Sequence, residues 1–127
     1  MILLDTHALL WWLLDDQRLS VPAREQIRRS DQIVFVSSAS GWEIATKHRL
    51  GKLGLGSWDP ATLPTLLEGD RIDVLPVSLA HALEAGLLPG PHRDPFDRVL
   101  IAQSRIEGLS IVSRDPVFSE YGLEVIW

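Results

Sequence analysis

Acidic residues stand at chemically informative places in this sequence, because two of them follow short apolar runs. Asp5 comes directly after Met1–Leu4, and Asp115 comes shortly after Leu109–Val112. Glu43 lies in a helical pattern that follows a further apolar run. If the apolar runs are parallel strands, their carboxyl ends meet at one edge of a sheet, where ligands bind in open α/β folds. The sequence therefore predicts a cluster of carboxylates at that edge.

Two more acids, Asp94 and Asp97, stand at the start of the helical pattern that precedes Leu109–Val112. They can reach the same edge of the sheet from the side. Carboxylates a few ångströms apart repel each other by several kcal/mol at an effective dielectric constant of about 20. A protein can keep such a group together only if protons or a cation compensate for the charge. Oxygen ligands without cysteine favour a hard ion, Mg²⁺ or Mn²⁺. Such an ion can activate a water and offset charge on a leaving oxygen, which is the chemistry of phosphodiester hydrolysis.

Each acid also has a structural interpretation as a helix cap, because carboxylates accept hydrogen bonds from free N–H groups at helix N-termini. Asp94-Pro95 and Asp115-Pro116 have the pattern of an N-cap followed by proline at the first helical position. Ser40 and Glu43 fit a capping box. Asp59-Pro60 repeats the motif after a glycine-rich loop rather than a strand, so we expect Asp59 to be a cap only. The functional interpretation therefore depends on the whole set.

The elements that would position these acids alternate between strands and helices. Predicted strands are Met1–Leu4, Ile33–Val36, Ile72–Leu75, Leu109–Val112 and Leu123–Ile126. Predicted helices are one through about Leu14, then Ser20–Arg29, Ser40–Leu50, Pro60–Gly69, Leu79–Leu87 and Pro95–Glu107, with loops at Gly51–Gly56 and Leu88–Arg93. The strands are mostly apolar without alternation, which is typical of parallel strands covered on both faces. We therefore expect an α/β fold, a three-layer sandwich around a central parallel sheet of about five strands, as one domain over residues 1–127.

Composition limits the class of protein. The chain has 127 residues, 46% of them hydrophobic and 23% charged, and no cysteine. These values are typical of one globular domain and exclude disulfides and thiolate metal sites. No signal peptide or membrane-spanning run is visible, so we expect a cytoplasmic protein without a membrane partner. The formal net charge of −5 gives no support to nucleic-acid binding, but it does not exclude binding at a local basic patch.

With these residues in place, the sequence resembles the PIN-domain family, and most closely the VapC-type toxin ribonucleases of type II toxin–antitoxin pairs. The matching segments are Ile2–His7, Ser40–Ile44, His92–Arg98 with Leu100–Gln103, and Ile111–Asp115. The resemblance implies a parallel sheet of order 3-2-1-4-5, dependence on Mg²⁺ or Mn²⁺ and cleavage of RNA. It also implies inhibition by a cognate antitoxin protein and assembly as a homodimer.

The resemblance also assigns residue roles. Asp5 resembles the first metal ligand, Glu43 the second acid, Asp97 the third and Asp115 the fourth. Asp94 is an additional acid of the subgroup with Asp-Pro-Phe-Asp-Arg, which makes the expected catalytic set Asp5, Glu43, Asp94, Asp97 and Asp115. Thr6 and Ser113 match small hydroxyl positions that support the carboxylates or bound water.

Basic and aromatic residues suggest how RNA would be held. The basic residues that could ring the acidic cluster and bind the RNA backbone are Lys47, Arg49, Lys52, Arg93, Arg98 and Arg114. His7 and His92 adjoin the acids but show no zinc-ligand spacing. Trp11 and Trp12 are adjacent on one predicted helix, so we expect one in the core and the other at a dimer, antitoxin or base-stacking surface.

Other functions are disfavoured by particular residues. A phosphatase that works through an aspartyl phosphate, of the HAD type, needs Asp-x-Asp after the first strand, whereas this chain has Asp5-Thr6-His7. A receiver-type signalling module needs a phosphoacceptor aspartate after the third strand, where this chain has Pro76. A housekeeping RNA-processing role remains open within the nuclease class.

Overall fold

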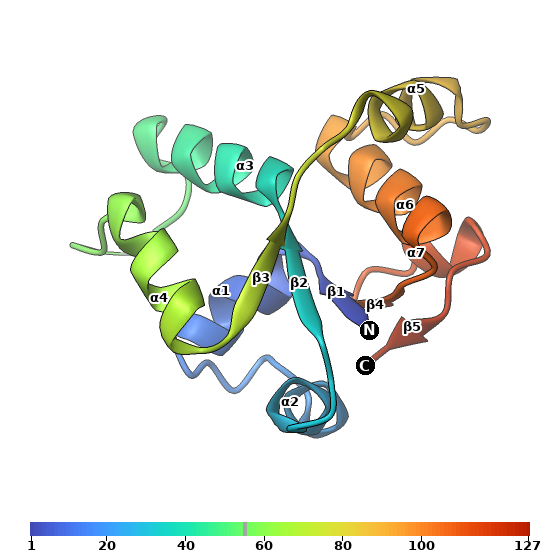
Figure 1. The fold of residues 1–127 in the computed structure, drawn as a ribbon. Coiled ribbons are helices and arrows are strands. Elements are labelled where there is room, and N and C mark those ends of the chain that lie inside the picture. The colour runs from blue at the N-terminus through green and yellow to red at the C-terminus, as the bar shows by residue number, and fades with distance from the viewer. Residues whose placement is uncertain (55) are drawn as a thin grey trace.

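Five short strands form one fully parallel sheet in the order β3-β2-β1-β4-β5. The computed structural model describes residues 1–54 and 56–127. The strands are β1 Ile2–Leu4, β2 Val34–Ser37, β3 Ile72–Leu75, β4 Ser110–Val112 and β5 Val125–Ile126. The central strand β1 pairs with β2 on one side and β4 on the other (Figure 1). The predicted three-layer α/β fold and its strand order are confirmed. A receiver domain has order 2-1-3-4-5, so that alternative is excluded.

Helices connect the strands nearly as the sequence patterns predict. They are α1 Thr6–Leu13, α2 Val21–Arg28, α3 Ser38–Arg49, α4 Leu63–Gly69, α5 Leu79–Leu87, α6 Pro95–Glu107 and the short α7 Val117–Glu120, with a 3-10 turn η1 at Pro60–Thr62. The bounds of α5 and α6 match the prediction. No helix was predicted for α7, although Asp115-Pro116 has the pattern of a helix start, and the N-cap of α7 is Pro116 rather than Asp115. A proline precedes this four-residue helix, and a segment so short shows no helical periodicity. Within the described residues, none of the helices is long and apolar enough to cross a membrane.

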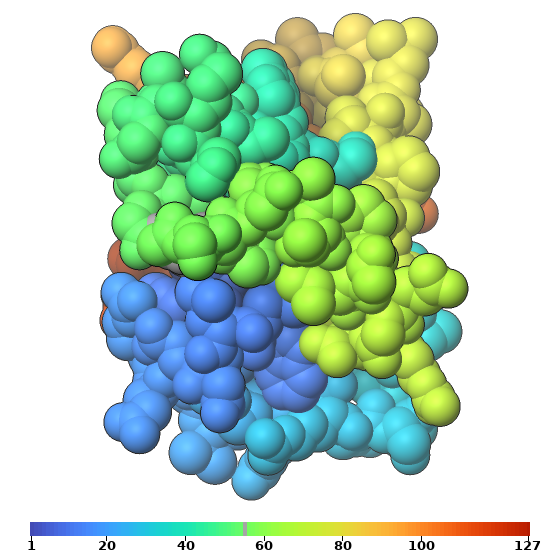
Figure 2. Space-filling view, turned by 90° about the vertical axis from the view of Figure 1, so that its left-hand side faces the viewer, coloured from blue at the N-terminus to red at the C-terminus, as the bar shows by residue number. Residues whose placement is uncertain are grey.

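Alternate residues of the central strand enter two separate cores. Ile2 and Leu4 pack with α1, α2 and α4 on one face of the sheet. Leu3 packs with α6 and α7 on the other face, in a cluster that includes Ile101 and Phe118. Figure 2 shows the first face, where the N-terminal segment lies against the α4 segment and α3 lies beside α4. Because both faces are covered, β1 is fully buried and its carboxyl end has a fixed position.

The predicted capping box at Ser40 is wrong. Helix α3 begins two residues earlier, and its N-cap is Ser37, whose hydroxyl accepts from the Ala39 N–H at 3.0 Å. Ser37 ends β2, so the strand runs into the helix without a loop, and local spacing alone could not reveal that junction. Glu43 therefore lies in the second turn of α3, with its carboxylate free of capping. Of the predicted glycine loop Gly51–Gly56, residue 55 lies outside the described residues.

Asp59 fulfils its expected capping role. Its carboxylate accepts from the Ala61 N–H at 2.9 Å at the start of η1. Asp94 caps α6 in the same manner, with one oxygen accepting from the N–H groups of Phe96 and Asp97 at 2.9 and 3.1 Å. The Asp-Pro motif thus predicts helix starts correctly at both sites.

Arg98 holds the loop between α5 and α6. Its guanidinium donates to the carbonyl oxygens of Ala85, Leu88 and His92 at 2.9, 2.5 and 2.9 Å. These three bonds attach the C-terminal end of α5 and the following loop to α6. The sequence predicts that Arg98 binds RNA, whereas in the structure its guanidinium donates to backbone carbonyls.

We predict that Arg98→Lys lowers the free energy of unfolding by about 1–3 kcal/mol, because an ammonium group cannot reach three carbonyls arranged around a planar guanidinium. Chemical denaturation of the purified protein measures this loss. Arg105→Lys is the matched control, because Arg105 is on the same helix and makes one exposed ion pair with Glu84 at 3.5 Å. An Arg98→Lys protein as stable as this control would contradict the role assigned to the loop.

Candidate active site

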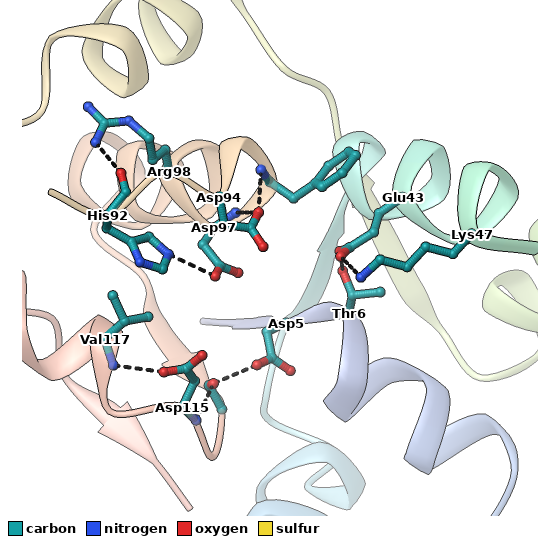
Figure 3. A network of polar contacts seen from close by, with 12 residues as sticks. Asp5, Thr6, Glu43, Lys47, His92, Asp94, Asp97, Arg98, Asp115 and Val117 are labelled. Carbon is teal, nitrogen blue, oxygen red and sulfur yellow. Dashed lines mark hydrogen bonds and ion pairs between the residues drawn. The ribbon is translucent and has the colours of Figure 1, made fainter. Parts of the chain in front are cut away.

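All five predicted acids line one cleft of about 520 Å³. Asp5 and Asp115 follow β1 and β4, Glu43 comes from α3, and Asp94 and Asp97 come from the start of α6 (Figure 3). The lining residues are Asp5, Thr6, His7, Trp11, Arg18, Glu43, Lys47, Asp94, Asp97, Arg114, Asp115 and Pro116. Strand ends and helix starts far apart in the sequence therefore deliver carboxylates to one place, at the carboxyl edge of the sheet.

Asp5 occupies the centre of this arrangement and is 7% exposed. One carboxylate oxygen accepts from the Ala8 N–H at 2.7 Å and so caps α1, while the other accepts from the Ser113 hydroxyl at 2.5 Å. Burial raises the pKa of Asp5 above its ordinary value, although the bonds from Ser113 and Ala8 act in the opposite direction. The side chain is thus fixed in position but poorly compensated as an anion.

Ser113 links two of the acids. Its hydroxyl donates to Asp5 and accepts from the Asp115 N–H at 3.0 Å. Asp115 in turn accepts from the Val117 N–H at 3.0 Å, which helps to start α7. The predicted supporting position of Ser113 therefore has a specific geometry: one hydroxyl orients both the end of β1 and the turn after β4.

Thr6 and Lys47 hold the carboxylate of Glu43, which is 6% exposed. The Thr6 hydroxyl donates to one oxygen at 2.6 Å and lies 3.0 Å from the Ser40 hydroxyl. The Lys47 ammonium donates to the other oxygen at 2.6 Å, one helical turn along α3. Lys47 was predicted to bind RNA, and the structure shows it paired with an acid at the cleft wall.

Asp97 lies between His92 and the other acids. Its Oδ2 is 3.0 Å from His92 Nε2. Burial raises the pKa of Asp97 to about 6, and the charges of Asp94 and Asp115 add to this effect, while His92 opposes it. The cleft therefore concentrates negative charge beyond what its own hydrogen bonds neutralise.

The donor set fits a hard divalent cation. The acids offer only oxygen ligands, and the raised pKa values of Asp5 and Asp97 show that a nearby positive charge would be stabilising. Within the described part of the chain, no three acidic or histidine side chains stand close enough to enclose an ion unaided. Mg²⁺ does not need such a cage, because it keeps several waters and binds through one or two carboxylates together with substrate phosphate.

The predicted basic residues divide into three groups. Lys47 and Arg114 line the cleft. Arg49, Lys52 and Arg93 are exposed and are not among the described residues of its wall. Arg98 serves the loop described above.

The sequence predicted no role, or only a general one, for two residues of the cleft wall, Trp11 and Arg18, and for His92, which contacts Asp97 from outside the wall. Trp11 is the core member of the tryptophan pair, 5% exposed, yet its ring reaches the cleft. Arg18 comes from the loop after α1, where no strand or helix pattern pointed to the site. His92 contacts an acid rather than open solvent. Their positions depend on tertiary packing and could not be found from spacing.

A pH-dependent prediction follows from Asp97. Its pKa is 3.8 when unfolded and about 6 when folded, so its favourable contribution to stability is complete below pH 3.8 and is lost as the pH rises through 6. Asp97→Asn stays neutral throughout. Without added metal, the variant should be more stable than wild type above pH 6 by about 2–3 kcal/mol, and the difference should vanish near pH 4.

Denaturation curves collected between pH 4 and pH 8 in the presence of a chelator test this expectation. Asp59→Asn is the control, because that carboxylate is exposed and outside the cleft wall. A difference between Asp97→Asn and wild type that does not change with pH would contradict the raised pKa of Asp97 in the folded protein.

Comparison with known proteins identifies the family. Residues 2–123 match the PIN domain. Ribonuclease VapC22 of Mycobacterium tuberculosis is 30% identical over 116 residues, 90% of this chain and 86% of that protein.

Solved structures with a similar fold include VapBC2 from Rickettsia felis bound to a promoter DNA fragment. Its TM-score is 0.71 and its sequence identity 15%, and the match covers 98% of this chain and 97% of that one. They also include DNA-bound VapBC from Salmonella typhimurium, with a TM-score of 0.63 and 18% identity. This match covers 98% of this chain and 97% of that one. At these identities the structural matches show the fold, while the sequence matches extend over nearly the whole chain. The protein therefore belongs to the PIN-domain family.

Proposed function

We propose that residues 1–127 form a single PIN domain that hydrolyses RNA phosphodiester bonds with the aid of Mg²⁺ or Mn²⁺. The observation that carries this proposal is the convergence of five carboxylates on one cleft, with burial and mutual repulsion raising the pKa of Asp97. Such an arrangement is unfavourable without a cation and becomes favourable with one. The sequence relative named a ribonuclease gives independent support.

The bound ion would polarise the phosphodiester and lower the pKa of an attacking water. Asp5 and Asp97 are the residues we assign to hold it, with Glu43 and Asp115 as further ligands, directly or through water. Ser113 and Thr6 keep Asp5 and Glu43 in fixed orientations through bonds of 2.5 and 2.6 Å.

Asp94 has a divided role in this proposal. One of its oxygens caps α6, which aims the helix and its partly positive N-terminus at the cleft. The neighbouring Asp97 is thereby placed on the first turn, where it lines the cleft with Asp94. We infer that Asp94 shapes the site and adds to its negative charge.

We further propose that the protein is the toxin of a toxin–antitoxin pair, inhibited by a cognate antitoxin in the cytoplasm. The neighbours from R. felis and S. typhimurium are VapBC complexes, and another is described as a toxin–antitoxin complex from Klebsiella pneumoniae. These descriptions favour the toxin role over a housekeeping RNA-processing role.

A homodimer is also proposed, with α5 as its contact. Leu79, Leu83 and Leu87 are spaced four residues apart on this helix and are 75%, 58% and 81% exposed. An apolar stripe of this kind is unfavourable in water. Two copies related by a twofold axis can cover it with each other, because an isologous contact uses the same surface twice.

Asp5→Asn and Asp97→Asn should each reduce metal-dependent RNA cleavage by at least a hundredfold, because each removes a charge that holds the ion. Cleavage of total RNA with Mg²⁺, with Mn²⁺ and in chelator, followed by mapping of the cut sites, measures the effect. Circular dichroism establishes that the variants are folded.

Asp59→Ala is the matched control for these variants. Asp59 is also an acid before a proline, but its carboxylate only caps η1. We expect full cleavage and a loss of stability of at most ~2 kcal/mol. Full activity in chelator, or loss of activity in Asp59→Ala equal to that in Asp5→Asn, would overturn the mechanism.

For the dimer, Leu83→Lys should shift the protein from dimer to monomer in analytical ultracentrifugation, because it places a charge in the middle of the stripe. Val21→Lys is the control, since Val21 is 67% exposed and lies on α2. A monomeric wild-type protein, or a Leu83→Lys protein that remains dimeric, would exclude α5 as the interface.

A further inference from the structure

The cleft presents a difficulty for RNA, because its acids repel every phosphate that is not bound to the metal ion. Phosphates on either side of the hydrolysed bond therefore need cationic side chains of the protein. The cations on the cleft wall are Arg18, Lys47 and Arg114. Lys47 donates to Glu43, an acid of the cleft itself, at 2.6 Å, whereas the ion-pair partner of Arg18, Asp16, is not among the described residues of the wall. The two arginines remain.

Both arginines lie against the same tryptophan. The guanidinium carbon of Arg114 is 4.7 Å from the centre of the Trp11 ring, and that of Arg18 is 5.2 Å away. Arg18 follows α1 and Arg114 follows β4, so two segments distant in sequence bring their charges to one ring. Cation–π contact holds each guanidinium in place through its face, so the N–H groups that have no other partner can still bind an anion.

Trp11 is a rigid support for this pair. It is 5% exposed, and its ring lies 5.8 Å from that of Trp127 and 5.6 Å from that of His7, measured between centroids. A ring fixed on several sides cannot turn away when a ligand arrives. The arginines therefore lose little side-chain entropy on binding, and that entropy is a principal cost of using flexible arginines at a surface.

The two guanidiniums are available to different degrees. Arg18 donates from Nε and Nη2 to the Asp16 carboxylate at 3.1 and 2.8 Å. These two bonds fix the plane of the guanidinium and leave Nη1 as the donor for a ligand. Arg114 is exposed and has no ion pair with any described residue. Arg114 thus carries the freer charge, and Arg18 adds an oriented donor beside it.

We propose that Arg18 and Arg114, stacked on Trp11, bind a phosphate of the RNA strand next to the phosphate that is hydrolysed. This inference rests on the proposed ribonuclease function and assigns it a substrate-binding site. Guanidinium groups match phosphate geometry through paired N–H donors. Arg114 is adjacent to Asp115, so the site borders the acids directly. The contact reads the backbone rather than the bases, and it therefore contributes affinity but no sequence preference.

The test uses Arg18→Gln, Arg114→Gln and the double variant in the full-length protein. The substrate is a short single-stranded RNA that wild type cuts once in Mg²⁺. Each single substitution should raise KM about fivefold to tenfold and change kcat less than twofold. The double variant should raise KM further than either single variant. RNA binding without cleavage is measured with the Asp5→Asn substitution added to each protein. In the double arginine variant, the slope of log binding constant against log salt concentration should be smaller in magnitude by about 0.7, the value for one lost phosphate contact.

Arg29→Gln is a close control. Arg29 is 52% exposed and pairs with Asp31 two residues away, through Nε and Nη2, as Arg18 does with Asp16. It is not on the cleft wall among the described residues, so its KM and salt slope should equal those of wild type. Arg114→Lys should recover part of the affinity, because it keeps the charge but not the planar donor edge.

The outcomes separate the two proposals. If wild type cleaves this RNA and the double variant matches Arg29→Gln in KM and salt slope, the phosphate site is wrong while the nuclease function stands. A fall in kcat with unchanged KM would also overturn the site, because it would place the arginines in the reaction step or in the fold. If wild type neither binds nor cleaves RNA in Mg²⁺ or Mn²⁺, the proposed function fails and the phosphate site fails with it.

Discussion

Negative charge is concentrated at one edge of the sheet, and the elements around that edge are arranged to hold it. Asp5 is buried at the end of the central strand, where burial keeps its pKa raised despite bonds from Ser113 and Ala8. The surrounding elements supply donors to the other acids: a hydroxyl and an ammonium to Glu43, and backbone N–H groups to Asp94 and Asp115. These bonds orient the carboxylates without fully compensating for them. The remaining imbalance is what a divalent cation would remove.

Helix capping and metal binding are often weighed as alternative explanations of an acid at a helix start, but here the two are compatible. A carboxylate has two oxygens, and capping occupies one. Asp5 caps α1 with one oxygen and takes the Ser113 bond with the other. Asp94 caps α6 through Oδ1 alone. Capping therefore fixes the rotation of the side chain, and the second oxygen keeps a defined direction. Asp59 differs because it caps the start of η1 and is not among the described residues of the cleft wall.

The fold was predictable because apolar runs and helical patterns alternate, and the Asp-Pro motifs mark helix starts. The convergence of the acids followed from the rule that the carboxyl ends of parallel strands share an edge. What the sequence could not show was set by tertiary contacts. The start of α3 depends on Ser37 ending a strand and capping a helix at once. Arg98 was assigned to RNA by its charge, whereas its partners are carbonyls brought close by the packing of α5 on α6. Arg18 meets Arg114 only because both reach Trp11.

The charge balance of the whole molecule bears on how such a site can select its substrate. The net charge is −5 and five carboxylates line the cleft, so the average charge of the molecule gives RNA no general attraction. In the proposed function, attraction would then come from a few local cations, which are the metal ion that the acids would hold and the two arginines at the border of the site. In the proposed function, a strand that does not reach both gains little attraction, because the net negative charge of the chain gives RNA no general steering. A ribonuclease with weak general affinity and a strong local contact would cleave strands that fit its cleft in preference to others, and this is the behaviour that the proposed function implies.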